Sequence, residues 1–153
     1  VSNDGDSSGG DVEAPTLTSS IPSDGAIDVA IDSDLVLNFS EVVNAESGSI
    51  TLKLSSDGSV VEAVDVTSGQ ISGSGTDQIT VSFISGAVNA TEYYVCIDDT
   101  CFDDDAGNSY AGITSPTELN FTTVDAPAPT LSDVAVTRFV SEVCACSIVT
   151  CFN

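Results

Sequence analysis

Histidine, tryptophan and methionine are missing from this chain of 153 residues, and basic residues are nearly so. Lys53 and Arg138 stand against 24 acidic residues, which gives a formal net charge of -22. Binding to nucleic acid or to an anionic lipid surface requires a footprint of lysine and arginine, so both partners are excluded. The absence of histidine removes the usual acid–base and triad chemistry, and we therefore expect no enzymatic activity.

Long apolar runs are also missing. None approaches the roughly 20 residues of a membrane-spanning helix, so membrane insertion is not expected. The chain begins Val1-Ser2-Asn3 without a leader, which we expect of the mature form of an exported protein. Five cysteines agree with an oxidising compartment, and their odd number leaves at least one without a partner in its own chain. A secreted or cell-surface location is therefore predicted.

Composition divides the chain into four parts. Residues 1–13 form an arm rich in Gly, Ser and Asp, and residues 125–130 form an extended, Pro-rich linker. Between them, residues 14–124 alternate apolar and polar side chains over short runs separated by turn residues. The last part, 131–153, is apolar and contains three cysteines.

The central part has the pattern of an all-β fold, and no stretch of it has sustained helical spacing. About seven short strands with turn signals between them predict an antiparallel β-sandwich with N- and C-terminal extensions. The clearest strand is 34–40, where Leu35, Leu37 and Phe39 share one face. The other clear runs are 49–54, 60–66, 78–84, 92–97 and 118–124.

An ordered set of short motifs in the same region resembles the bacterial Ig-like domain of the S-layer and surface-protein type. The motifs are Ala14–Leu17, Ile21–Val29, Leu37–Glu41, Thr91–Val95, Asp104–Asn108 and Phe121–Thr123. The resemblance covers about residues 14–124, and it implies an Ig-like sandwich that serves as an extracellular spacer or adhesive module. Two features depart from the family pattern: Val42 stands where a proline commonly follows Ser-Glu, and Cys96 and Cys101 interrupt the approach to the Ala-Gly-Asn turn.

The apolar tail is the most specific indication of function. A sandwich that is complete by about Thr123 has no obvious need of another strand, and a large exposed apolar surface marks an interaction site. We therefore predict that the tail is an assembly strand that pairs with another copy of the chain. The positions assigned to the assembly strand are Val134, Val136, Phe139, Val140, Val143 and Ile148.

An acidic loop is the best candidate for a metal site. Clustered carboxylates repel one another unless a hard cation or solvent compensates, and calcium takes about six to eight oxygen ligands. The alternative is a solvated loop in which Asp104 and Asn108 form the side-chain-to-backbone bonds of a tight turn. A second acidic group, Asp24 to Asp34, is attributed to the overall acidity. The candidate calcium ligands are Asp98, Asp99, Asp103, Asp104, Asp105 and Asn108.

The cysteines suggest disulfides. Cys96 and Cys101 flank a short loop that is able to bring their Cα atoms within the roughly 4.4–6.8 Å of a disulfide, so we predict a bond between them. In an extended strand Cys144 and Cys146 point to the same face about 7 Å apart, so they are not expected to bond each other. Cys144, Cys146 and Cys151 are left for tail or intermolecular disulfides, for buried free thiols, or for a thiolate metal site.

Two hypotheses follow. In the first, the protein is a structural subunit of an extracellular filament, pilus-like fibre or surface layer. It forms a homopolymer by head-to-tail addition of the tail as a β-strand. In the second, it is a calcium-dependent adhesin or spacer module of a larger surface protein. No cofactor other than calcium is expected.

Overall fold

In the computed structural model, residues 10–83 and 86–125 are described. The predicted linker from residue 126 and the tail 131–153 lie outside them, as does most of the arm. No helix in these ranges is long and apolar enough to cross a membrane. The structure consists of ten strands: β1 (Leu17–Ile21), β2 (Ala26–Val29), β3 (Leu35–Ala45), β4 (Ser49–Leu54), β5 (Val60–Asp65), β6 (Ile71–Ser72), β7 (Thr76–Val81), β8 (Glu92–Ile97), β9 (Phe102–Asp103) and β10 (Asn120–Thr123).

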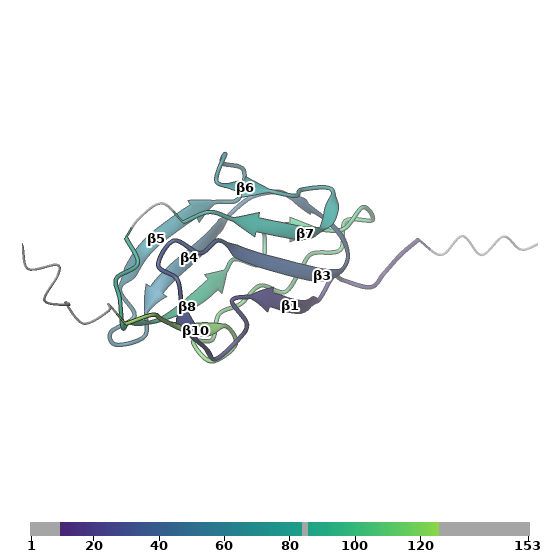
Figure 1. Cartoon of the computed structure of the whole chain (residues 1–153). Helices are drawn as coiled ribbons and strands as arrows, with labels where there is room; N and C mark the ends of the chain where they lie inside the picture. Colours follow the sequence, from purple (N-terminus) through teal and green to yellow (C-terminus); the bar gives the residue numbers. More distant parts are fainter. Residues whose placement is uncertain (1–9, 84–85, 126–153) are drawn as a thin grey trace, which may run out of the picture.

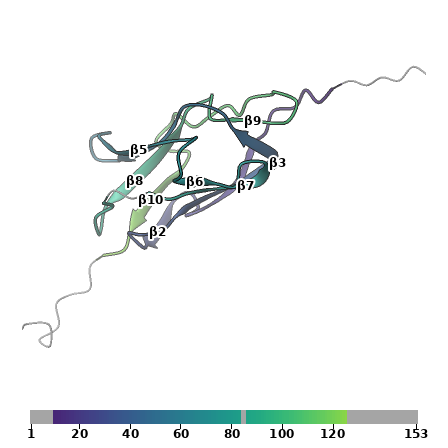
Figure 2. The same ribbon diagram turned by 90° about the horizontal axis from the view of Figure 1, so that it is seen from above.

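The strands form a sandwich of two five-stranded sheets (Figures 1 and 2). The first has the order β1-β3-β7-β6, with β9 paired to the far end of β3. The second has the order β2-β10-β8-β4-β5. All pairs are antiparallel except β10 with β2, which is parallel. The predicted all-β, Ig-like sandwich is therefore confirmed, with one parallel pair that the sequence did not indicate.

The core lies between the two sheets and follows from the period of two in the sequence. On β3, Leu35, Leu37, Phe39 and Val43 are buried, while the residues between them are partly or fully exposed. Phe39 packs against the rings of Phe102 and Tyr110 at centroid distances of 5.3 and 5.2 Å. The remaining buried apolar residues are Ile50, Leu52, Val64, Val66, Ile79, Val81, Tyr93, Val95, Ile97, Cys101, Ile113, Leu119 and Phe121.

The first two strands belong to different sheets. β1 pairs with β3, the turn at residues 22–25 crosses the sandwich, and β2 then pairs with β10 in the other sheet. Asp24 holds this crossing, because its Oδ1 accepts hydrogen bonds from the backbone N–H and the side-chain amide of Asn120, at 3.1 and 2.9 Å. On this flank of the sandwich, both sheets therefore end in a short edge strand.

The described chain enters and leaves at opposite ends of the sandwich. In Figures 1 and 2 the described segment before β1 extends from one end of the long axis, and the described chain after β10 leaves at the other end. At the exit, the N–H of Val124 donates to the carbonyl of Val29 at 2.8 Å. The last described residues are thus fixed beside the end of β2.

Each edge strand has a feature that limits further pairing. β1 has a register shift between Leu17 and Ser19, and β6 has only two residues. β2 has four residues, one of which is Asp28 with φ 57°. β5 has a register shift opposite Leu52 and Lys53. Short and bulged edges are a common protection against unspecific strand pairing.

Several predicted strands agree closely with the structure. The run 49–54 is β4, and 92–97 is β8. The run 34–40 extends further, to Ala45, because the second half of β3 gains β9 as a partner. The run 78–84 begins two residues too late and ends three residues too late, since β7 spans Thr76–Val81. Four strands, β1, β2, β6 and β9, were not predicted as separate elements because they are short and depend on partners distant in sequence.

A core truncation should measure how far stability depends on β3. We expect Leu37→Ala to lower the free energy of unfolding by about 3 kcal/mol, because the fully buried side chain leaves a cavity between the sheets. Val60→Ala, on an exposed position of β5, should change it by no more than about 0.5 kcal/mol. Urea unfolding of both variants checks this, and equal effects would contradict the proposed core.

Candidate metal centre

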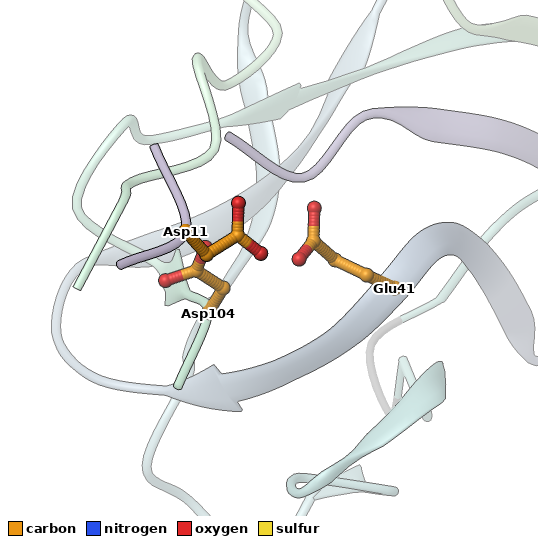
Figure 3. Close-up of side chains that lie close together, drawn as sticks. All are labelled: Asp11, Glu41 and Asp104. Carbon is orange, nitrogen blue, oxygen red and sulfur yellow. The ribbon is translucent and has the colours of Figure 1, made fainter. Parts of the chain in front are cut away.

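Three carboxylates meet where the N-terminal segment passes over the sandwich. Asp11 belongs to this segment, Glu41 to β3, and Asp104 to the loop after β9. One oxygen of each lies within 4.8 Å of the other two. Figure 3 shows the carboxyl group of Asp11 beside that of Asp104, with Glu41 reaching toward them from β3. The three residues are referred to below as the acidic triad.

Backbone and side-chain hydrogen bonds bring Asp11 to this place. Ser40 binds the segment twice: its N–H donates to the carbonyl of Thr16 at 2.9 Å, and its Oγ accepts from the N–H of Thr16 at 3.0 Å. Nearer the N-terminus of the segment, the side-chain amide of Asn108 donates to the carbonyl of Asp11 at 3.2 Å. The segment is therefore fixed to β3 at one point and to the loop after β9 at another.

The loop around Asp104 is a tight turn built on that side chain. Its Oδ1 accepts from the N–H groups of Ala106 and Asn108, both at 2.8 Å, and its Oδ2 accepts from the Asn108 amide at 2.7 Å. These bonds, the Asn108 side chain first, lower the pKa of Asp104 against the opposing effect of desolvation. The tight-turn interpretation of Asp104 and Asn108 is thus confirmed.

Glu41 is in the opposite electrostatic situation. Its half-buried carboxyl group has a raised pKa, first through desolvation and then through repulsion by Asp11, Asp104 and Glu13. No basic residue of the ranges 10–83 and 86–125 is among the charges that act on this carboxyl group. The site therefore disfavours the negative charge that Glu41 carries in neutral solution, and a cation between the carboxylates would remove that penalty.

The geometry and the ligand types of the triad fit a hard divalent cation. Calcium binds oxygen at about 2.3–2.6 Å, so two ligands on opposite sides of the ion are separated by about twice that distance. Two carboxylate oxygens have about four acceptor positions, of which three are used in Asp104, so this residue retains capacity for one more bond. An adjoining depression of about 420 Å³, lined also by Val42 and Asp105, leaves room for water ligands.

The six predicted ligands do not come together as a site. Of the acidic ones, only Asp104 belongs to a group of three carboxylates in the part of the chain that the structure describes. Asp98 accepts from the backbone N–H of Ser49 at 2.9 Å, and Asp105 accepts from the Asn44 amide at 2.8 Å. Asp103 lies in β9, and Asp99 is exposed. Asn108 contributes indirectly, by hydrogen bonds to Asp104 and Asp11.

Two residues of the triad were missed by sequence reasoning. One indication of Glu41 was present in the sequence, because this residue ends the Leu37–Glu41 motif of the family resemblance. The motif was interpreted as part of a strand and not as part of a metal site. Asp11 carried none, because a Gly/Ser/Asp-rich arm gives no indication of where it lies on the folded domain. Their meeting with Asp104 depends on how the arm passes over β3.

The predicted disulfide between Cys96 and Cys101 is wrong, because both are free thiols. Cys96 alternates along β8 with the buried residues Val95 and Ile97 and lies on the outer face of the sheet. Cys101 is fully buried in the core, where desolvation raises the pKa of its thiol to about 11. The two side chains thus occupy opposite sides of the sheet. Cys144, Cys146 and Cys151 lie outside the described residues.

The raised pKa of Glu41 leads to a test in the absence of divalent cations. A carboxyl group whose pKa is raised on folding stabilises the protein when protonated, and this contribution is lost as the pH rises through the folded pKa. In EDTA, we therefore expect Glu41→Gln to melt at a higher temperature than the parent at about pH 7. The difference should shrink toward about pH 3. If the difference in melting temperature between Glu41→Gln and the parent stays constant over this pH range, the pKa of Glu41 is not raised and the description of its surroundings is wrong.

Comparison with known proteins agrees with the fold. The sequence pattern of the bacterial Ig-like domain matches residues 11–123. CopC from Methylosinus trichosporium OB3b has a similar structure, with a TM-score of 0.52 and 17% sequence identity. The match covers 76% of this chain and 99% of that one, and at this identity it concerns the fold alone. None of the curated proteins matches the sequence. Since the domain pattern spans most of the chain, the protein belongs to the family of bacterial Ig-like domains.

Proposed function

We propose that the protein is a structural subunit outside the cytoplasm that joins to further copies through its C-terminal segment, residues 131–153. The family to which it belongs consists of structural and binding modules at the cell surface or in the periplasm, without enzymatic activity. That much is the general function. The specific proposal is a homopolymer, in the form of a filament or a surface layer, that grows by strand addition.

The observation that supports this proposal is that the sandwich is complete without the segment. Both sheets have an unbroken strand order between Leu17 and Thr123, so a further strand has a place only at an edge. The inner positions of β3, β7, β8 and β10 are filled by residues of the same region. The core of the described residues is thus filled without the apolar residues of 131–153, and we infer that another copy covers them.

In the proposed assembly, each copy donates its segment to one neighbour and accepts the segment of another. A head-to-tail contact of this kind does not close on itself, so repetition produces a fibre. The protected edges described above make pairing at random positions unfavourable, which favours a single, specific acceptor.

A charged residue in the segment should prevent assembly. We expect Val140→Asp to reduce polymers to monomers, because an aspartate without a partner is costly to bury, whereas Ser141→Asp, one residue further on, should assemble normally. Light scattering and electron microscopy of the full chain, in reducing buffer, give the readout. A parent protein that stays monomeric at all concentrations would contradict the proposal. Ladders on non-reducing gels would show additional bonds through the tail cysteines.

The acidic triad supports a second candidate function, a calcium-dependent spacer or adhesin module. In this case the cation would bind Asp11, Glu41 and Asp104 and so fasten the N-terminal segment to β3 and to the loop after β9. In such a module, bound calcium would restrict the motion of the N-terminal segment relative to the sandwich. The proximity of the three carboxylates is the supporting observation, and the identity of the ion is part of the proposal.

Thermal melting in calcium tests this second candidate. A ligand at about 100 times its dissociation constant stabilises the folded state by about 2.7 kcal/mol, so a clear rise of the melting temperature is expected. Asp11→Asn should remove most of the rise. Asp99→Asn removes the same charge from an exposed position outside the triad and serves as the matched control. If both variants respond like the parent, calcium acts only by screening the net charge, and this candidate fails.

A further inference from the structure

Two isoleucines on one flank of the sandwich are exposed to an unusual degree. Ile21, at the end of β1, is 64% exposed, and Ile27, in β2, is 72% exposed. They line the same groove of about 380 Å³, at the place where the chain passes from one sheet to the other. Pro22, Ala26, Val29 and Ala30 continue its apolar lining. In a soluble domain, a contiguous apolar surface of this kind marks an interaction site.

The rim of the groove is acidic. Asp28 and Asp34 line it as well, and both are exposed. Neither accepts a hydrogen bond within the described residues, in contrast to Asp24, which is bound by Asn120. The groove therefore combines apolar walls with two carboxylates that accept no hydrogen bond from the part of the chain that the structure describes. A partner with apolar side chains around a single cation would match it.

The C-terminal segment of the chain has this chemistry. Within residues 126–153 the charged residues are Asp133, Arg138 and Glu142, so the segment is almost neutral. Val136, Phe139 and Val140 surround Arg138. Arg138 is also the one basic residue besides Lys53, and Lys53 lies over the ring of Tyr94 on the outer face of the second sheet, 5.9 Å from its centroid.

We propose that the groove between the end of β1 and β2 is the acceptor for residues 134–140 of a neighbouring copy, with Arg138 between Asp28 and Asp34. This inference rests on the proposed assembly and specifies its contact. β1 and β2 are the edge strands of the two sheets, so a segment in the groove would contact both strands and cover the exposed side chains of Ile21 and Ile27.

The chain length between groove and segment favours a neighbouring copy over the same one. The exit of the chain is hydrogen-bonded to Val29, a residue of the groove itself. The linker 125–130 then precedes the segment, and a Pro-rich sequence of this kind extends by about 3.1 Å per residue with little bending. From this composition we expect the linker to hold residues 131 and beyond away from the groove of their own copy.

Substitution of Ile27 in the full chain tests the acceptor. We expect Ile27→Asp to raise the protein concentration needed for assembly at least roughly tenfold, as for a central contact of an interface. Val60→Asp is the matched control, since Val60 is 59% exposed on β5 at the far edge of the second sheet, and it should assemble like the parent. Circular dichroism should show the same fold for both variants.

Mixing two defective variants tests the exchange between copies. Ile27→Asp has an intact segment and a defective groove, and Val140→Asp has the reverse. Each alone should be monomeric, and an equal mixture should form a heterodimer that grows no further. A segment bound to its own copy would give no heterodimer, and that result would overturn the inference. In the same way, Asp34→Lys and Arg138→Glu should each weaken assembly, and their combination should restore it.

The outcomes separate this inference from the proposed function. If Val140→Asp prevents assembly but Ile27→Asp does not, the segment binds elsewhere, so the groove is not the acceptor although the proposed function stands. If neither variant changes assembly, both proposals fail. If Ile27→Asp and Val60→Asp act equally, added charge rather than the groove is responsible, and the inference is overturned.

Discussion

The excess of negative charge is the constraint on which most of the polar structure depends. With two basic residues in the chain, ion pairs cannot balance 24 carboxylates. The structure uses neutral donors instead. Asp104 is held by Asn108 and backbone N–H groups, Asp24 by Asn120, and Asp65 and Asp57 by the residues two positions later in their turns. These bonds lower the pKa of Asp57, Asp65 and Asp104 and keep each turn in one conformation.

The same constraint singles out the carboxylates that accept no such bond from the described residues. At the acidic triad, Glu41 faces Asp11 and Asp104, and its raised pKa reflects burial and repulsion without compensation. At the groove, Asp28 and Asp34 border an apolar surface. The first place suits a small divalent cation, because three carboxylate oxygens approach one another closely. The second suits a side chain with one positive charge, because its walls are apolar.

Charge also bears on how copies of the molecule can approach one another. Bodies that each carry about twenty negative charges repel at low ionic strength, and salt or divalent cations reduce this repulsion. In the proposed assembly, a nearly neutral segment would contact a neighbour without bringing two acidic surfaces fully together. The proposed cation and the proposed segment contact would both reduce this repulsion, so the two proposed functions are compatible in one molecule.

The sequence by itself determined the fold class and much of the core. Leu35, Leu37 and Phe39, or Tyr93 and Val95, alternate because one face of each strand must be covered, and this local rule holds wherever the strands lie in space. The family resemblance placed these strands in an Ig-like sandwich. The tight turn at Asp104 and Asn108 was also predictable, since it involves neighbours in sequence.

Tertiary structure decided what depends on distant partners. The passage of the chain from β1 to β2 places Ile21 and Ile27 in one groove, and the path of the N-terminal segment brings Asp11 to Glu41 and Asp104. It also turns Cys96 outward and Cys101 into the core, although only four residues separate them. Strand periodicity fixes which face a side chain occupies, but it contains no information on which loop or edge comes to lie beside it. That is decided by the pairing of strands far apart in the chain.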